Sequence, residues 1–522
     1  MKVGFVLLFA SLAWSQISGR VVNSVTGEGV GKALVRLTGR GIARSVMTAK
    51  DGSFVFAKVA EGNYTLEPLK QNYFAKGSAM RVEVREEDKV EGLVFGLEPG
   101  AVIAGRLLDE DGDPLEGVSV TGARRVYREG TYVMESVWQG RTNDLGEFRL
   151  SGLKAGRYFI KAQAPSSMFS MLNEPYEASD GEYARVPSYF PGVADLESAR
   201  PIVVKPGQVV TGMDFSALRG KVYRVEGKFA LAESDGQLYA TLDRIGMLKD
   251  TSGFPQPQTA IFPGSGAFQF RGIQPGRYLL TVSSNTKAGL QGQVEVTVGG
   301  ADVKDLDVPR IETGPLRGVI RLEGAEDNAE QWKSGLELVL YCQIGLRSTT
   351  GTSVTPAPDG SFEFERGISG RKTLQVQKMP KPLFLKHFRL NGKELEDAVF
   401  YEGGEIEMIL SPRVSGILGK VEGAKGGTVI AQSIKAKRLG SGEGLNLDAE
   451  IAPLGAFEFG AIGPGEYRLY AFDRNFEENL LDPEFLRNFA AKSVIVKIGE
   501  GETKTVTLPL IAASEVEEAQ NQ

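Results

Sequence analysis

Residues 52–66, with the sequence GSFVFAKVAEGNYTL, contain the unit that decides the fold. Gly52 precedes an alternating apolar stretch that includes Phe54, and Gly62 precedes a second stretch that includes Tyr64. Alternation of apolar and polar residues is typical of half-buried strands, and glycine is typical of the turns between them. The stretch therefore predicts a β-hairpin whose aromatic side chains share one face.

This unit occurs five times, always with its two glycines ten residues apart, which is the signature of an internal repeat. A phenylalanine follows the first glycine in every copy. A tyrosine follows the second glycine in four copies, and Lys372 takes that position in the other. The residues in phase are Gly52, Phe54, Gly62, Tyr64, Gly146, Phe148, Gly156, Tyr158, Gly266, Phe268, Gly276, Tyr278, Gly360, Phe362, Gly370, Gly455, Phe457, Gly465 and Tyr467. Glycines suit turns and aromatic residues suit a core, so the repeat predicts a structural element.

Each unit opens with an apolar–x–Gly–x–apolar stretch, of which residues 17–21 and 103–107 are examples. Glycine within a strand indicates close backbone approach or a bulge. Many short strands separated by turns, with almost no helix, predict an all-β chain of about five antiparallel, immunoglobulin-like β-sandwiches in tandem. One short helix is expected near the C-terminus, roughly residues 482–491, with Asp482 as its N-cap and Pro483 in its first turn.

The repeats give the predicted organisation of the chain. Residues 1–15 are expected to be a signal peptide, followed by five sandwiches and a disordered tail at 514–522. The sandwiches are expected at 16–100, 101–218, 219–312, 313–413 and 414–513, and the second carries an insertion at 164–200.

The N-terminal segment fits a secretory signal. Lys2 precedes an apolar run at 3–14 that is too short to span a membrane, and Ala13 and Ser15 fit the small residues before a cut at Gln16. The alternative is a buried first strand. The signal predicts export to the periplasm, the outer surface or the medium. No later stretch is apolar enough for a transmembrane segment.

Charge and cysteine content exclude some classes of function. The net charge of −6 is spread along the chain without a basic block, which argues against nucleic acid as a partner. Cys342 is the only cysteine, so no internal disulfide can form. It lies in the alternating run ELVLYCQI, which predicts a buried free thiol rather than a nucleophile.

The opening strand, the hairpin and the turn DEDGDPLEGV at 109–118 together resemble the carboxypeptidase regulatory-like domain. That resemblance implies a transthyretin-like (prealbumin-type) sandwich, akin to Cna-B-type domains, over nearly the whole chain after the signal. It is weakest in the fourth unit. The multi-unit layout with its Tyr-Phe-Pro-Gly insertion also looks like exported proteins of acidobacterial type. In carboxypeptidases the regulatory-like domain is the non-catalytic companion of the enzyme domain.

The sequence offers no convincing catalytic group or cofactor site. A zinc carboxypeptidase needs at least two histidine ligands, and a serine triad needs one histidine as its base. This chain has only His387, in a strand-like run that favours a surface or cross-strand position. We therefore expect no catalytic residues, no cofactor and no enzyme activity.

Asp109, Asp111 and Asp113 have the alternate spacing of a calcium loop. No glutamate stands at the twelfth position, and Gly112 and Pro114 follow the pattern of a turn. A solvated hairpin turn is the favoured interpretation, and a metal site is a weak alternative.

The insertion supplies the best candidates for ligand binding, Tyr176, Tyr183, Tyr189 and Phe190, with Met168 and Met171 nearby. Exposed rings can stack on sugars or anchor a partner protein. The alternative, which we favour, is that this loop folds back and seals the joint between the second and third units.

The leading hypothesis is a non-catalytic, exported cell-envelope protein, a modular scaffold for protein–protein interaction or adhesion. Polysaccharide binding through exposed aromatic loops is the second hypothesis, and a hydrolase is the third. Function is expected in the loops that differ between the copies.

Overall fold

The structure is a computed structural model, and the part of the chain that it describes begins at Ser15. The described residues are 15–520 without 77–78, 86–87, 129–130, 164–182, 233–235, 246–248, 251–257, 285–289, 312–314, 325–335, 345–347, 365–370, 378–382, 396–397, 402, 435–445 and 475–477. Most of the predicted signal segment, Tyr176 and the repeat residue Gly370 therefore lie outside the described residues.

Domain 1 shows the plan that the other domains repeat, two packed sheets around one core. One sheet has the order β4-β1-β8-β6 and the other β3-β2-β5-β7. The first strand pairs antiparallel with the phenylalanine strand β4 and parallel with the closing strand β8, so the sheet is mixed. The strands are β1 (Ser15–Asn23), β2 (Leu34–Gly39), β3 (Ile42–Met47), β4 (Ser53–Val59), β5 (Gly62–Leu69), β6 (Tyr73–Lys76), β7 (Met80–Val84) and β8 (Lys89–Pro99).

Domain 2 adds the insertion and a long hairpin to this plan. Its sheets have the orders β12-β9-β17 and β15-β13-β10-β11-β22, and the last of these strands belongs to domain 3. The elements are β9 (Ala101–Leu108), β10 (Ser119–Arg128), β11 (Thr131–Arg141), β12 (Glu147–Leu153), β13 (Gly156–Gln163), β14 (Tyr183–Arg185), β15 (Ser188–Tyr189), η1 (Leu196–Ser198), β16 (Ile202–Val204), β17 (Val209–Val210) and β18 (Phe215–Ser216).

Domains 3 and 4 follow the same order of strands. In domain 3 these are β19 (Arg219–Lys221), β20 (Tyr223–Phe229), β21 (Leu238–Arg244), β22 (Lys249–Asp250), β23 (Gln258–Ala260), β24 (Ala267–Ile273), β25 (Gly276–Ser284), β26 (Leu290–Val298) and β27 (Val303–Val308). In domain 4 they are β28 (Leu316–Leu322), β29 (Glu337–Ile344), β30 (Ser348–Val354), β31 (Ser361–Phe364), β32 (Lys372–Gln377), β33 (Phe384–Leu390), β34 (Lys393–Glu394), β35 (Val399–Phe400) and β36 (Gly404–Ser411).

Domain 5 carries a helical layer on the outer face of one sheet. Its elements are β37 (Ser415–Val421), β38 (Thr428–Ser433), β39 (Asn446–Glu450), β40 (Ala456–Ile462), β41 (Gly465–Phe472), η2 (Glu478–Leu481), α3 (Pro483–Arg487), η3 (Ala490–Lys492), β42 (Val494–Ile498), β43 (Thr503–Leu508), β44 (Leu510–Ile511) and α4 (Ala513–Gln520). The layer buries a second apolar cluster that includes Ile430, Phe472, Leu486 and Val516.

The two helices test two sequence predictions. The helix expected near 482–491 is confirmed as α3, and the Asp482 carboxylate accepts hydrogen bonds from the amides of Glu484 and Phe485 as its N-cap. The expected disordered tail from Ser514 is wrong, because α4 occupies Ala513–Gln520. Val516 is fully buried in the second cluster, and this contact holds an otherwise polar, acidic helix against the sheet.

The repeat residues form the cores and turns that their spacing predicts. The five repeat phenylalanines are only 2–5% exposed. The first glycine of each unit has a φ of +66° to +87°, and a Cβ there would lie 2.1–2.5 Å from a carbonyl oxygen of the first strand. Any side chain would be strained and would clash. Each tyrosine hydroxyl in turn donates to the carbonyl four residues earlier, at 2.7–3.1 Å.

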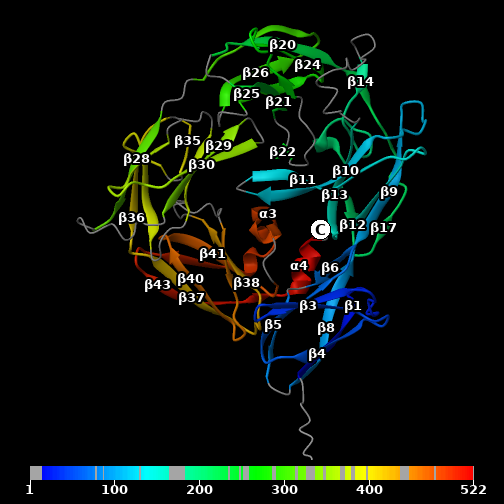
Figure 1. Cartoon of the computed structure of the whole chain (residues 1–522), viewed down its shortest axis with the longest axis vertical. Coiled ribbons are helices and arrows are strands. Elements are labelled where there is room, and N and C mark those ends of the chain that lie inside the picture. The colour runs from blue at the N-terminus through cyan, green and yellow to red at the C-terminus, as the bar shows by residue number, and fades with distance from the viewer. Residues whose placement is uncertain are drawn as a thin grey trace, which may run out of the picture.

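The five domains close into a ring, which the sequence did not predict (Figure 1). Domain 5 returns to domain 1 through an ion pair of 3.7 Å between Arg81 and Glu450. It also reaches domain 2, where Tyr132 hydrogen-bonds Asp482. Within the part of the chain that the structure describes, no helix is both long and apolar enough to cross a membrane.

Candidate functional site

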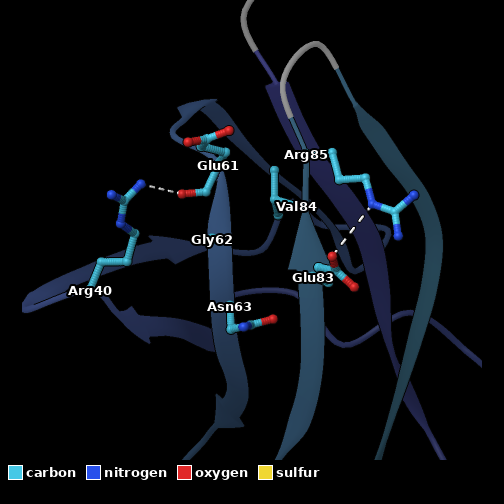
Figure 2. A pocket seen from close by; sticks show the side chains of 7 residues that line it. All are labelled: Arg40, Glu61, Gly62, Asn63, Glu83, Val84 and Arg85. Atoms are coloured by element: carbon cyan, nitrogen blue, oxygen red, sulfur yellow. Dashed lines mark hydrogen bonds and ion pairs between the residues drawn. The ribbon is translucent and has the colours of Figure 1, made fainter.

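A polar groove of about 270 Å³ lies at one end of domain 1 (Figure 2). It forms where β5 begins beside the end of β7, with Gly62 opposite Val84 and Asn63 opposite Glu83. The seven residues that line it are Arg40, Glu61, Gly62, Asn63, Glu83, Val84 and Arg85. The walls are therefore backbone and charged side chains rather than an apolar pocket.

Two arginines border the groove, one held by a backbone carbonyl and the other paired with a carboxylate. Arg40 lies in the turn between β2 and β3 at a φ of +49°, and its guanidinium donates to the Glu61 carbonyl. Gly62 has no side chain where the Arg40 stem crosses it, and a Cβ there would meet that stem at 2.5 Å. Arg85 lies 3.4 Å from the Glu83 carboxylate. Figure 2 shows both arginines on the rim.

The groove presents both hydrogen-bond donors and hydrogen-bond acceptors. Two guanidinium groups can donate to carboxylates or carbonyls, while Glu61, Glu83 and Asn63 can accept. Such a mixed, open and polar surface suits an extended peptide or a polar chain more than a small apolar ligand. In the described part of the chain no cluster of histidine, cysteine or acidic residues could hold a metal ion.

The aromatic candidates of the insertion separate into two groups. Tyr189 is 6% exposed and belongs to β15, which pairs with β13. Phe190 packs against the core of domain 2, with its ring 6.0 Å from that of Phe215. In this arrangement Tyr189 is buried and Phe190 is half-buried, so neither is a fully exposed aromatic ring. Tyr183 is 48% exposed and is the described member of the set that keeps an accessible ring.

The described part of the insertion, residues 183–200, also joins domains 2 and 3, as the alternative that we favoured expects. Strand β14 pairs with β19, which begins the next domain, and Ala184, Val186 and Val222 form a small core between them. Asp195 lies 3.9 Å from Arg244 of domain 3.

The Asp109 carboxylate of the DEDGDP turn accepts hydrogen bonds from the backbone amides of Asp111 and Asp113, at 3.0 and 2.9 Å. This is an Asx-type turn at the surface, which fits the favoured interpretation of a solvated hairpin turn.

The single histidine and the single cysteine both have structural positions. The His387 ring lies 2.9 Å from the Glu394 carboxylate in a cross-strand position of domain 4. Cys342 is fully buried in the core of that domain, and burial raises the pKa of its thiol to about 11. A thiol with a raised pKa is a poor nucleophile.

Lys372, which replaces the repeat tyrosine, lies directly across the sheet from Cys342. It is 2% exposed, and its ammonium donates to the Tyr401 carbonyl at 2.6 Å. Burial lowers the pKa of Lys372 below its ordinary value. The lysine thus keeps a hydrogen bond to backbone in place of the tyrosine contact, at the cost of a charge in the core.

Sequence reasoning missed the contact between the long hairpin of domain 2 and the helical layer of domain 5. Arg125 lies 3.1 Å from Glu484, and its guanidinium lies 3.7 Å from the centre of the Tyr132 ring. One signal was present in the sequence: residues 119–141 form an alternating stretch longer than its counterparts in the other units. Its partner could not be read from the sequence.

Comparison with known proteins finds a family match in the first domain. Residues 16–94 match the family model of the carboxypeptidase regulatory-like domain, which is the family that the sequence motifs resemble. A curated relative, BOS complex subunit NOMO1 of Mus musculus, is 24% identical over 136 residues. That match spans 25% of this chain and only 10% of the relative.

Several solved structures of bacterial proteins also match parts of the chain. The Bacillus anthracis TIE protein is 14% identical and has a TM-score of 0.17, covering 56% of this chain and 50% of that one. Two B repeat units of the collagen-binding protein of Staphylococcus aureus are 11% identical, with a TM-score of 0.14, covering 76% and 99% of the two chains. A Streptococcal ancillary pilin is 14% identical, with a TM-score of 0.21, covering 56% and 99%. At these scores the similarity carries no information on ligands or partners.

Proposed function

We propose that this chain is a non-catalytic, exported scaffold of the cell envelope that binds another protein. The proposal rests on the observation that the described repeat residues have structural roles in each domain. The described phenylalanines fill cores, the tyrosines hold backbone carbonyls, and the first glycines form turns. Recognition is then left to the surface features that differ between domains, as is usual for repeat proteins.

The polar groove of domain 1 is the feature best suited to contact a partner protein. Arg40 is held in place by a backbone carbonyl, Arg85 pairs with the Glu83 carboxylate, and the edge of the groove offers donors and acceptors for a peptide. Arginine is enriched at protein interfaces and pairs well with carboxylates.

A photo-crosslinking experiment in producing cells tests the proposal. A photoreactive amino acid replaces Asn63 in the groove of the full chain, and in a matched control it replaces the exposed residue Glu295 of domain 3. We expect a distinct protein crosslink from the groove position, which weakens when Arg40 and Arg85 are changed to alanine. Identical crosslinks from both positions, or none from the groove, would count against the groove as the partner site.

Export is tested separately by fractionation and by mass spectrometry of the mature N-terminus. The signal prediction expects the chain in the envelope or the medium, starting at Gln16. A cytosolic protein that retains the first fifteen residues would contradict export. Ser15 already lies in β1 and donates a hydrogen bond to the Arg85 carbonyl, so cleavage before Gln16 would remove this contact.

Polysaccharide binding is the second candidate, and the exposed Tyr183 ring favours it. Lys221 lies 5.9 Å from that ring, so the tyrosine presents a mixed aromatic and cationic surface. Glycan-array binding that is lost on Tyr183→Ala and kept on Tyr73→Ala would support this role. A hydrolase is the least supported of our hypotheses. It would be revived by an activity that survives purification and disappears on His387→Ala.

A further inference from the structure

The hairpin formed by β10 and β11 is longer than its counterparts and extends beyond its own sheet. Its strands have 10 and 11 residues, against 6 and 6 for β2 and β3 of domain 1. Strand β13 pairs only with Ser119–Ala123 of β10. Beyond Ala123, the described residues of β10 pair with β11 rather than with β13.

The extended part of the hairpin instead contacts domains 3 and 5. Val133 and Met134 pair in parallel with β22 of domain 3, and both side chains are only 4% exposed. On the domain 5 side, the Tyr132 hydroxyl donates to the Asp482 carboxylate at 2.6 Å. Figure 1 shows β11 running from domain 2 toward α3 and β22, across the middle of the ring.

The contact with domain 5 is compact and made of complementary charges. Arg125 pairs with Glu484 at 3.1 Å and stacks over the Tyr132 ring at 3.7 Å. Tyr127 packs edge-on against Tyr132, with the ring centres 5.2 Å apart. Asp482 is also the N-cap of α3, so the helix terminus holds this carboxylate in place for the hairpin.

We propose that the two arms of this hairpin, residues 124–128 and 131–134, form a releasable strap that holds the five domains in a closed ring. Among the described residues, Arg81 also pairs with Glu450 between domains 1 and 5, but their side chains are 80% and 75% exposed, and exposed ion pairs of this kind contribute little. Closure then depends chiefly on the hairpin. Its ion pair is half exposed, so salt screens it, and ionic strength shifts the balance between closed and open rings.

Distance measurement in the full chain tests the strap. Cysteines are placed at Asp144 of domain 2 and Lys497 of domain 5, both exposed, and carry spin labels for pulsed dipolar spectroscopy. The native Cys342 is fully buried and does not compete for label. The test variant combines Arg125→Ala with Tyr132→Phe. The control is Arg277→Ala, which removes an exposed ion pair of 2.9 Å inside domain 3.

The wild type is expected to give one narrow, short distance at low salt. The test variant is expected to raise the ratio of open to closed chains by roughly tenfold or more, because it removes a charge-assisted hydrogen bond and a stacked ion pair. Added salt should widen the wild-type distribution and leave the control like the wild type. Hydrogen exchange of the domain 2 core checks that the variant stays folded. A folded variant with the wild-type distribution, or a wild type that is already open, overturns the proposal.

Discussion

The phenol of Tyr132 in domain 2 donates a 2.6 Å hydrogen bond to the carboxylate of Asp482 in domain 5, across 350 residues of chain. The pKa of Tyr132 is raised well above its ordinary value, first by burial and then by this bond. The tyrosine therefore stays protonated as a donor throughout the physiological range. This pair is one of the contacts that join the second domain to the last in the closed ring, beside the ion pair of Arg125 with Glu484.

Asp482 has two roles that substitutions can separate. Asn at this position keeps an N-cap oxygen for α3 but replaces the charged acceptor of Tyr132, whereas Ala removes both. We expect Asp482→Ala to lower the stability of the α3 region by about 1 kcal/mol more than Asp482→Asn does. Amide exchange at Glu484 and Phe485 measures the cap. Equal exchange in the two variants would show that the cap contributes nothing.

Gly266 should not tolerate a side chain. Its φ is +66°, and a Cβ would lie 2.1 Å from the Phe229 carbonyl oxygen. We expect Gly266→Ala to cost about 2 kcal/mol or more, since the left-handed backbone and the clash both oppose it. Gly299→Ala is the control, because nothing lies within 4 Å of its Cβ position and its φ is not in the left-handed region. Hydrogen exchange during chemical denaturation measures the stability of domain 3 separately from the other domains. Equal stability of Gly266→Ala and Gly299→Ala would contradict this account of the repeat glycine.

Phe268 is the core residue of domain 3 that we expect to be most costly to truncate. It is 2% exposed, and its ring lies 5.9 Å from that of Phe270. Phe268→Ala is expected to cost roughly 3–5 kcal/mol through lost burial and the cavity left behind. Phe268→Leu keeps most of the volume and should cost distinctly less. Two variants of the same stability, each measured in the full chain by hydrogen exchange of domain 3, would show that this position is not packed.

Lys372 makes the stability of domain 4 depend on pH. Burial lowers its pKa in the folded domain below the ordinary 10.5. Between the folded and unfolded pKa values the unfolded chain binds more protons, so this group adds stability as pH rises through that window and costs stability below it. We expect Lys372→Met to stabilise domain 4 at pH 7, and the gain to shrink as pH approaches 10.5.

The pH dependence must be compared between the wild type and Lys372→Met, because the titration of Cys342 changes the stability of domain 4 in the opposite direction. Its pKa is raised from 9.0 to about 11, so its contribution to stability is lost as pH rises from 9 to 11. The difference between wild type and Lys372→Met largely removes that contribution. A gain that stays constant from pH 7 to pH 10.5 would refute the buried-charge explanation.

The sequence predicted the parts of the fold that local pattern controls. The Gly-x-Phe strand requires a turn glycine and a core ring within three residues, so its period was visible along the chain. The predictions of a buried Cys342 and of a surface turn at Asp109 agree with the structure for the same reason. In each case the residues that determine the local structure are close in sequence or recur with the period of a strand.

Features that depend on distant partners could not be predicted in this way. The bond between Tyr132 and Asp482 could not be predicted, because the sequence marks Asp482 only as a helix N-cap and does not distinguish Tyr132 from its neighbours. Helix α4 has one fully buried apolar residue, Val516, so its sequence resembles that of a polar tail. The groove depends on Arg40 crossing Gly62, a contact between the β2–β3 turn and β5 that the repeat pattern does not specify.

Small-angle X-ray scattering of the wild-type full chain at low salt tests the closed ring most directly. Five domains of about 100 residues, each near 34 Å across, would span roughly 170 Å in a row and roughly 90 Å in a closed ring. The ring account predicts a maximum dimension near the smaller value and a pair-distance distribution without a long tail. A maximum dimension near the larger value would contradict it.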